Sequence, residues 1–149
     1  MTLGILLALH LLGAVLLVGG MAFALLVLRP SLTVLEPPQR RALHAQVFRR
    51  FFLIVWHAMP VLLATGYAML FGVLGGFAGV GPAVHVMHML GLIMAAIFLV
   101  IFFGPWRAMR AAMAAQNRDA AARAVDRIRL LIQINLALGA VTVVVAAWV

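Results

Sequence analysis

Four long apolar stretches constrain the fold of this chain more than any other feature. They cover residues 3–28, 51–74, 83–106 and 130–148. A helix needs about 20 apolar residues to cross the ~30 Å hydrocarbon core of a bilayer, and each stretch reaches about that length. Backbone groups in lipid must be hydrogen-bonded internally, and the alternation typical of a membrane β-barrel is missing. The sequence therefore predicts an all-α integral membrane protein, in which one domain forms a bundle of four transmembrane helices.

The composition agrees with this class of protein. Hydrophobic residues make up 67% of the chain and charged residues only 9%, whereas soluble domains carry about 25% charged residues. The lipid bilayer is therefore the first expected partner. The apolar N-terminal stretch lacks a charged leader region and is too long for a signal peptide, so we expect a retained first helix. The absence of cysteine excludes disulfides, iron–sulfur clusters and thiolate metal sites.

The arginines predict how the helices are oriented. All eleven cationic side chains are arginines, and they lie in two connections, residues 29–50 and 107–129. The connection at residues 75–82 and both ends of the chain carry no charged side chain. The positive-inside rule then places the basic loops in the cytoplasm and both termini in the periplasm of a bacterial inner membrane. Because these arginines flank membrane spans, the net charge of +8 is a topology signal and we expect no nucleic-acid binding.

The connections and the span ends carry further signals. A proline pair precedes a short amphipathic segment at residues 39–50, and residues 117–129 are predicted to extend the third or fourth helix into the cytoplasm. Tryptophans favour the membrane–water interface, so we expect anchors near the span ends at Trp56, Trp106 and Trp148.

Histidines are the main source of chemistry within the spans. At 1.5 Å per residue, His10 lies about 10 Å and His88 about 8 Å below the outer surface, so the two are nearly level. His85 is shallower, at about 3 Å, and His57 belongs to the inner half of its span. Polar groups in hydrocarbon usually pair, line a cavity or bind something. We therefore predict that His10 and His88 are ligands of one cofactor, with Tyr67 at a similar depth as a supporting group.

Two level imidazoles on different helices can ligate both faces of one haem iron, or share a copper or zinc ion. Small residues such as Gly13 and Gly91 lie on the histidine faces and leave room for a flat ring, although small residues also permit close helix packing. On the inner side, His57 is expected to hydrogen-bond Asn135 or Gln133, or to form a second site with Asn135. His44 is expected to be a solvated loop residue.

Methionines support a different hypothesis. The third span opens with His85, Met87, His88 and Met89 within five residues. Soft thioethers and imidazoles suit Cu(I). His85, Met87 and His88 are thus a candidate copper capture site, while most other methionines are expected to fill gaps in the core.

Two segments carry a family resemblance. Residues 9–23 read LHLLGAVLLVGGMAF, with a histidine before a Gly-Gly pair that is followed by an aromatic residue. Residues 129–139 read RLLIQINLALG, with Asn135 at a polar position. They resemble the copper-resistance D (CopD) family of four-helix membrane proteins and its haem-b-associated relative HemJ, a protoporphyrinogen oxidase.

The resemblance implies roles for individual residues. By it, His10 matches the histidine of the first helix and His85 that of the third. The third helix of HemJ opens with a His-x-Lys motif, whose lysine position is Met87 here, and this chain has no lysine. Protoporphyrinogen oxidase activity is therefore not predicted, and whether the protein is a membrane oxidoreductase is left open. Depth favours His88 as the second ligand and the motif favours His85.

The leading hypothesis from the sequence is an inner-membrane protein that binds haem b. Such a protein would transfer electrons or perform porphyrin-linked redox chemistry, with quinone or a redox protein as its partner. The first alternative is a copper-binding or copper-transport membrane protein. The second is an accessory structural subunit of a membrane complex, whose histidines are only hydrogen-bonded. Assembly as a homo-oligomer is left open.

Overall fold

The computed structural model of this chain describes residues 2–148 and consists of two antiparallel helical hairpins. The first hairpin contains α1 (Thr2–Phe23), the π-helical turn η1 (Ala24–Leu28), α2 (Arg29–Ser31), the 3₁₀ turn η2 (Leu32–Val34) and α3 (Pro37–Gly72). The short η3 (Phe77–Gly79) connects it to the second hairpin, which contains α4 (Pro82–Phe103), α5 (Pro105–Ala114) and α6 (Arg118–Ala146). No strand occurs in this part of the chain, so the all-α prediction is confirmed.

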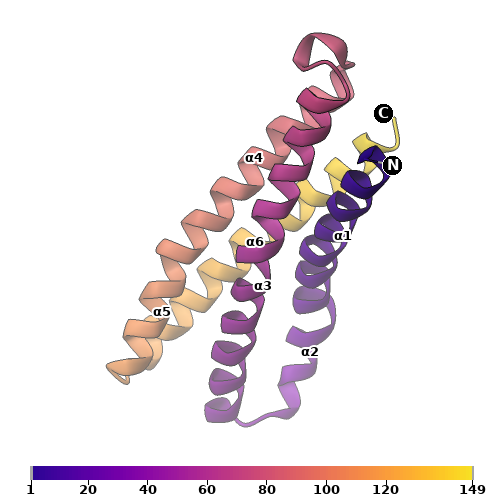
Figure 1. The fold of residues 1–149 in the computed structure, drawn as a ribbon. Coiled ribbons are helices and arrows are strands. Elements are labelled where there is room, and N and C mark those ends of the chain that lie inside the picture. Colours follow the sequence, from indigo (N-terminus) through magenta and orange to yellow (C-terminus); the bar gives the residue numbers. More distant parts are fainter. Residues whose placement is uncertain (1, 149) are drawn as a thin grey trace.

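Four helical segments within residues 2–148 are long and apolar enough to cross a membrane, which confirms the four-helix membrane prediction. Many large hydrophobic side chains point outward, as lipid-facing side chains do. All eleven arginines lie in α2, the first half of α3, α5 and the first half of α6. We call this the arginine end. The opposite end, where α3 meets α4 and where both termini lie (Figure 1), is called the histidine end.

The amphipathic segment and the second span predicted from the sequence form one continuous helix, α3. Its start is fixed by a capping box, in which Gln39 Oε1 accepts a hydrogen bond from the backbone N–H of Glu36 at 3.3 Å. Pro37 occupies the first helical position, where a missing N–H costs nothing. With 36 residues, α3 is about 54 Å long and exceeds the ~30 Å hydrocarbon core. Its arginine-bearing first turns, residues 37–50, therefore extend beyond the membrane-spanning part.

The third predicted span ends earlier than expected, because the chain bends at Gly104. This glycine has φ −97° and ψ −101°, and a Cβ there would lie 2.7 Å from the carbonyl oxygen of Val100. Pro105 then starts α5. The bend turns Trp106 inward, where it is 5% exposed and packs on Phe52, with ring centroids 5.1 Å apart. The prediction that Trp106 is an interface anchor is therefore wrong.

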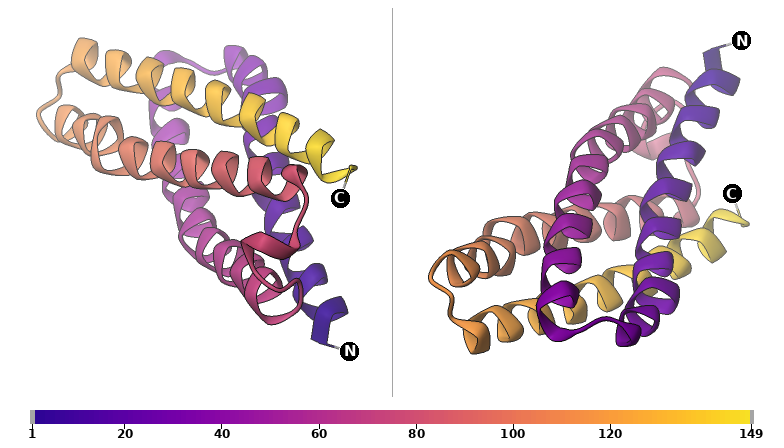
Figure 2. Two further views of the ribbon diagram at one scale, coloured as in Figure 1. Left: turned by 90° about the horizontal axis from the view of Figure 1, so that it is seen from above. Right: turned by 90° about the horizontal axis from the view of Figure 1, so that it is seen from below.

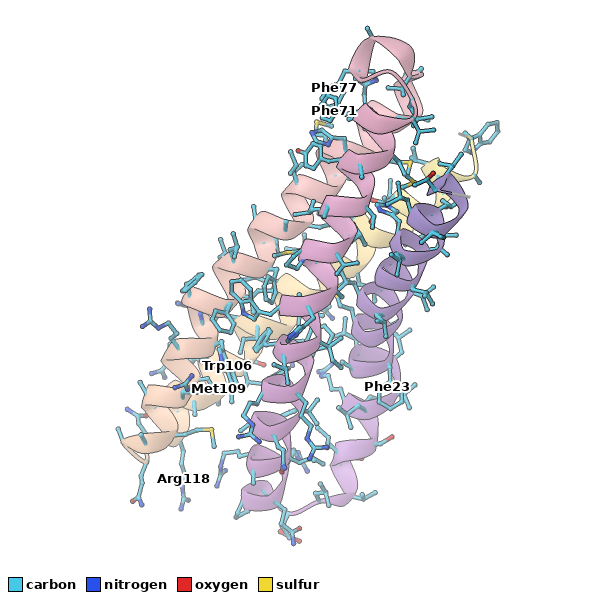
Figure 3. The ribbon with its side chains drawn as sticks, viewed as in Figure 1. Phe23, Phe71, Phe77, Trp106, Met109 and Arg118 are labelled. Atoms are coloured by element: carbon cyan, nitrogen blue, oxygen red, sulfur yellow. The ribbon has the colours of Figure 1, made fainter. Side chains whose placement is uncertain are left out.

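The second hairpin lies obliquely across the first (Figure 2), and most of the buried core fills the crossing. Trp106 and Met109 mark this region toward the arginine end (Figure 3). Near the histidine end the helices approach through glycines. A Cβ at Gly13 would lie 3.3 Å from Leu62 Cβ, and one at Gly139 would lie 3.0 Å from Val18 Cγ2. Aromatic side chains therefore dominate the core at the crossing, while glycines allow close approach of α1 to α3 and of α6 to α1.

Candidate functional site

His10 on α1 is held by α3. Its Nδ1 lies 3.0 Å from the carbonyl oxygen of Leu62 and 3.1 Å from the hydroxyl of Thr65. A carbonyl oxygen can only accept, so Nδ1 donates and Nε2 keeps its lone pair. Thr65 is buried, and its own hydroxyl donates to the carbonyl oxygen of Val61 at 2.7 Å. His10 therefore forms a polar contact between the first and second spans.

Side chains fill the space beside two glycines near His10. A Cβ at Gly66 would lie 3.1 Å from His10 Cε1, which means that the imidazole occupies the space beside this glycine. Gly13, one turn along α1, is closed off in the same way by Leu62. Gly13 therefore serves close helix packing, whereas a Cβ at Gly91, the other small residue expected to leave room for a ring, would meet nothing within 4 Å. The space beside Gly13 and Gly66 is thus taken by Leu62 and by His10 itself, and the packing there gives haem no support.

His88 on α4 contacts a different side of α3 from the side that His10 contacts. Its ring centroid is 5.3 Å from that of Tyr67, so the two side chains are neighbours. At 100° per residue, Tyr67 projects about 140° from Leu62 and about 160° from Thr65 around α3. His10 therefore contacts one face of α3, and His88 contacts nearly the opposite face. The structure does not bring these two histidines together as a ligand pair.

The first turns of α4 present a separate cluster. His85 is exposed, and its Nδ1 lies 3.1 Å from the carbonyl oxygen of Gly81, so Nε2 of this residue also keeps its lone pair. His88 follows one turn later on the same face. Both imidazoles pack on Phe77, with ring centroids 5.6 Å and 5.0 Å from it. The alternative second ligands of the sequence analysis, His85 and His88, are thus neighbours.

Met87 and Met89 lie on different faces of α4. Met89 is 55% exposed and follows His85 by four residues, which places it about 40° from His85 around the helix. Met87 is half-buried and lies about 160° from His85. The sulfur on the histidine face therefore belongs to Met89, whereas the sequence-based capture site used Met87.

Phe77 is a site residue that the sequence analysis missed. It comes from the glycine-rich connection, where Gly75 and Gly76 adopt positive φ angles of 78° and 79°. Phe77 also packs edge-on against Phe71, with centroids 5.7 Å apart, and Figure 3 shows the two rings together at the histidine end. An aromatic residue in a short connection that is otherwise rich in glycine was the available signal.

Gly79→Ala tests the close packing of the connection between α3 and α4. A Cβ at Gly79 would overlap the carbonyl oxygen of Leu74, so the backbone must move. We expect a loss of about 1–3 kcal/mol of stability and faster hydrogen exchange confined to residues 73–84. Gly81→Ala is the matched control, since a Cβ there meets nothing within 4 Å. Equal exchange in the two variants would contradict the described loop.

His57 and Asn135 are not partners. His57 is exposed on α3, and its Nδ1 bonds the carbonyl oxygen of Leu53 in its own helix at 2.8 Å. Asn135 is buried on α6 and donates through Nδ2 to the carbonyl oxygen of Met94 at 3.3 Å. The expected hydrogen-bonded pair is therefore wrong, and the arrangement lends no support to a second inner site.

His44 is not a solvated loop residue. It lies on the part of α3 beyond the membrane span, is half-buried and stacks on Phe48, with ring centroids 5.7 Å apart and planes 5° apart. Burial lowers the pKa of His44 below its ordinary value, and the charges of Arg40 and Arg29 lower it further.

Across residues 2–148, no three histidine, aspartate or glutamate side chains lie close enough together to hold a metal ion. A metal at the histidine end would therefore depend on imidazole pairs and thioethers. The cluster of His85, His88 and Met89 is the set that offers them on one helix face.

Comparison with known families bears on these residues. A sequence model of one family, CopD, described as Copper resistance protein D, matches residues 45–149. No curated protein and no solved structure gives a significant match. The matched range covers more than half of the chain and contains the α4 cluster, whereas it begins after His10.

Proposed function

The chain belongs to the CopD family, and we propose that it binds copper as Cu(I) at its histidine end. The observation that carries this proposal is the placement of His85 and His88 on one face of α4, with both rings packed on Phe77. The name of the family, Copper resistance protein D, points to the same metal.

The donor atoms suit Cu(I). His85 offers Nε2, because its Nδ1 is used by the carbonyl oxygen of Gly81, and Met89 offers a thioether one position after His88. Imidazole and thioether ligands select soft metals, whereas Mg²⁺ and Ca²⁺ require oxygen ligands. The three acidic residues, Glu36, Asp119 and Asp126, all belong to the arginine end. We therefore infer that hard cations are disfavoured at the histidine end.

The proposed direction of access follows from the arginines. The positive-inside rule places the arginine end in the cytoplasm of a bacterial inner membrane, so the histidine end faces the periplasm. His85 and Met89 are exposed there. In this proposal, Cu(I) is a substrate that the protein takes up at the outer surface of the membrane.

Haem b, the leading hypothesis from the sequence, receives less support. The imidazoles of His10 and His88 contact opposite faces of α3. The space beside Gly13 is occupied by Leu62, and the space beside Gly66 by the His10 ring. The accessory-subunit hypothesis differs from both, because it predicts neither metal nor haem.

The deciding experiment loads the purified protein with Cu(I) under anaerobic, reducing conditions. We expect stoichiometric copper by elemental analysis after desalting, and an absorption spectrum without a Soret band. A Soret band that His10→Ala removes would favour haem and contradict the proposal. A protein that holds neither copper nor haem would also contradict it.

The two methionines give a matched test of the ligand set. Leucine is close to methionine in volume, so each Met→Leu change removes the sulfur with little repacking. We expect Met89→Leu to weaken Cu(I) affinity about tenfold, equivalent to about 1.4 kcal/mol, and Met87→Leu to leave it unchanged. Competition with a chromogenic Cu(I) chelator measures both. Equal affinities in the two variants would exclude Met89 as a ligand.

A further inference from the structure

A small cavity lies at the arginine end, between the end of the first span, α3 and α6. Its volume is about 50 Å³. One water needs roughly 10–15 Å³ by the same measure, so a group the size of a phosphate fits. Arg29 from α2, His44 from α3 and Arg129 from α6 all line it. Three elements thus contribute a basic residue each to the lining of this cavity.

The other walls of the cavity are apolar. They are formed by Leu25 and Leu28 of η1, Val47 of α3 and Ile132 of α6. Positions 29 and 129 flank the apolar stretches at 3–28 and 130–148, which puts the cavity at the level where the hydrocarbon ends. The π-helical turn η1 contributes directly to the wall, and such turns are rare and frequently occur at functional sites. The lining therefore suits a molecule with an anionic head and apolar tails.

The charges of this end are not balanced by the protein. Eleven arginines face three acidic residues in the sequence. Over residues 2–148 the only ion pair joins Arg129 to Asp126, with Nη1 and Oδ1 3.0 Å apart. A guanidinium has five N–H donors, so Arg129 can still bind an anion. A counter-ion from outside the chain is therefore favoured.

We propose that this cavity binds the phosphate of an anionic phospholipid, with Arg29 and Arg129 as donors and the acyl chains along the apolar wall. Basic pockets between transmembrane helices recognise anionic headgroups in this way. The site lies at the opposite end from the α4 cluster, and the proposal does not depend on copper binding.

Native mass spectrometry of the detergent-solubilised, unsubstituted protein tests the choice of ligand. We expect phosphatidylglycerol to remain bound and to raise the thermal midpoint, and phosphatidylcholine to do neither. If phosphatidylcholine binds as well as phosphatidylglycerol, the proposal is wrong. If inorganic phosphate alone gives the same stabilisation, the site takes a free anion and the lipid assignment is overturned.

Paired variants test the location. Arg29→Gln/Arg129→Gln removes two charges from the cavity, whereas Arg107→Gln/Arg123→Gln removes two exposed arginines outside it. We expect phosphatidylglycerol affinity to fall about tenfold in the first variant and to change less than about twofold in the second. Equal losses would show a general charge effect and contradict the site. The lipid comparison on the unsubstituted chain decides the matter if the first variant fails to fold.

Discussion

Phe52→Ala is expected to destabilise the protein by about 3–5 kcal/mol. Phe52 is 2% exposed at the crossing of the hairpins, and its ring contacts five other aromatic rings, those of Phe48, Phe51, Phe98, Phe102 and Trp106. Helices in a membrane associate chiefly through packing, because lipid is as apolar as the side chains. The cavity left by the ring should therefore weaken the contact between the first and second hairpins. Unfolding in mixed micelles with increasing SDS measures the change.

Leu53→Ala provides the control for Phe52→Ala. Leu53 is the next residue of α3 but is 62% exposed on the lipid-facing surface. Its truncation leaves no cavity, so we expect a change within about 0.5 kcal/mol. Comparable destabilisation in the two variants would show that the hairpins do not cross as described.

The elements of the fold were predictable where local sequence determines them. The length of each apolar stretch sets the number of spans, and each predicted stretch lies largely within one of the four helical segments. The burial of Trp106 was not predictable, because it depends on the bend at Gly104 and on the second hairpin crossing the first. A tryptophan at a span end can face lipid or protein, and only the tertiary arrangement decides which.

The candidate site shows a similar division. Counting residues gives the depth of a side chain but not the neighbour it faces, so His10 and His88 looked like a pair although α3 separates them. Counting residues could also have identified Thr65 as a partner of His10. Thr65 lies at the depth of His10 on the adjacent span, and the two side chains are hydrogen-bonded. The choice of Met89 over Met87 follows from helical periodicity alone and was also available from the sequence.

Loss of both imidazoles of the α4 cluster should have the largest effect on metal binding. We expect His85→Ala/His88→Ala to weaken Cu(I) affinity by at least about a hundredfold, equivalent to about 2.8 kcal/mol. The remaining donor on that face, the Met89 thioether, cannot hold the ion alone. Both histidines pack on Phe77 near the protein surface, so the variant should keep its helices. Chelator competition gives the affinity, and circular dichroism checks the fold.

Two single variants show whether this loss is specific to α4. His57→Ala removes an exposed imidazole that bonds only its own helix, and neither affinity nor stability should change. His10→Ala should retain Cu(I) but lose about 0.5–1.5 kcal/mol of stability, because α1 loses its hydrogen bond to the carbonyl oxygen of Leu62, which keeps the Thr65 hydroxyl as a donor. If instead His10→Ala abolished copper binding while the double variant kept it, the metal would belong to α1 and α3. Such a result would overturn the α4 site and would leave the membership of the chain in the CopD family untouched.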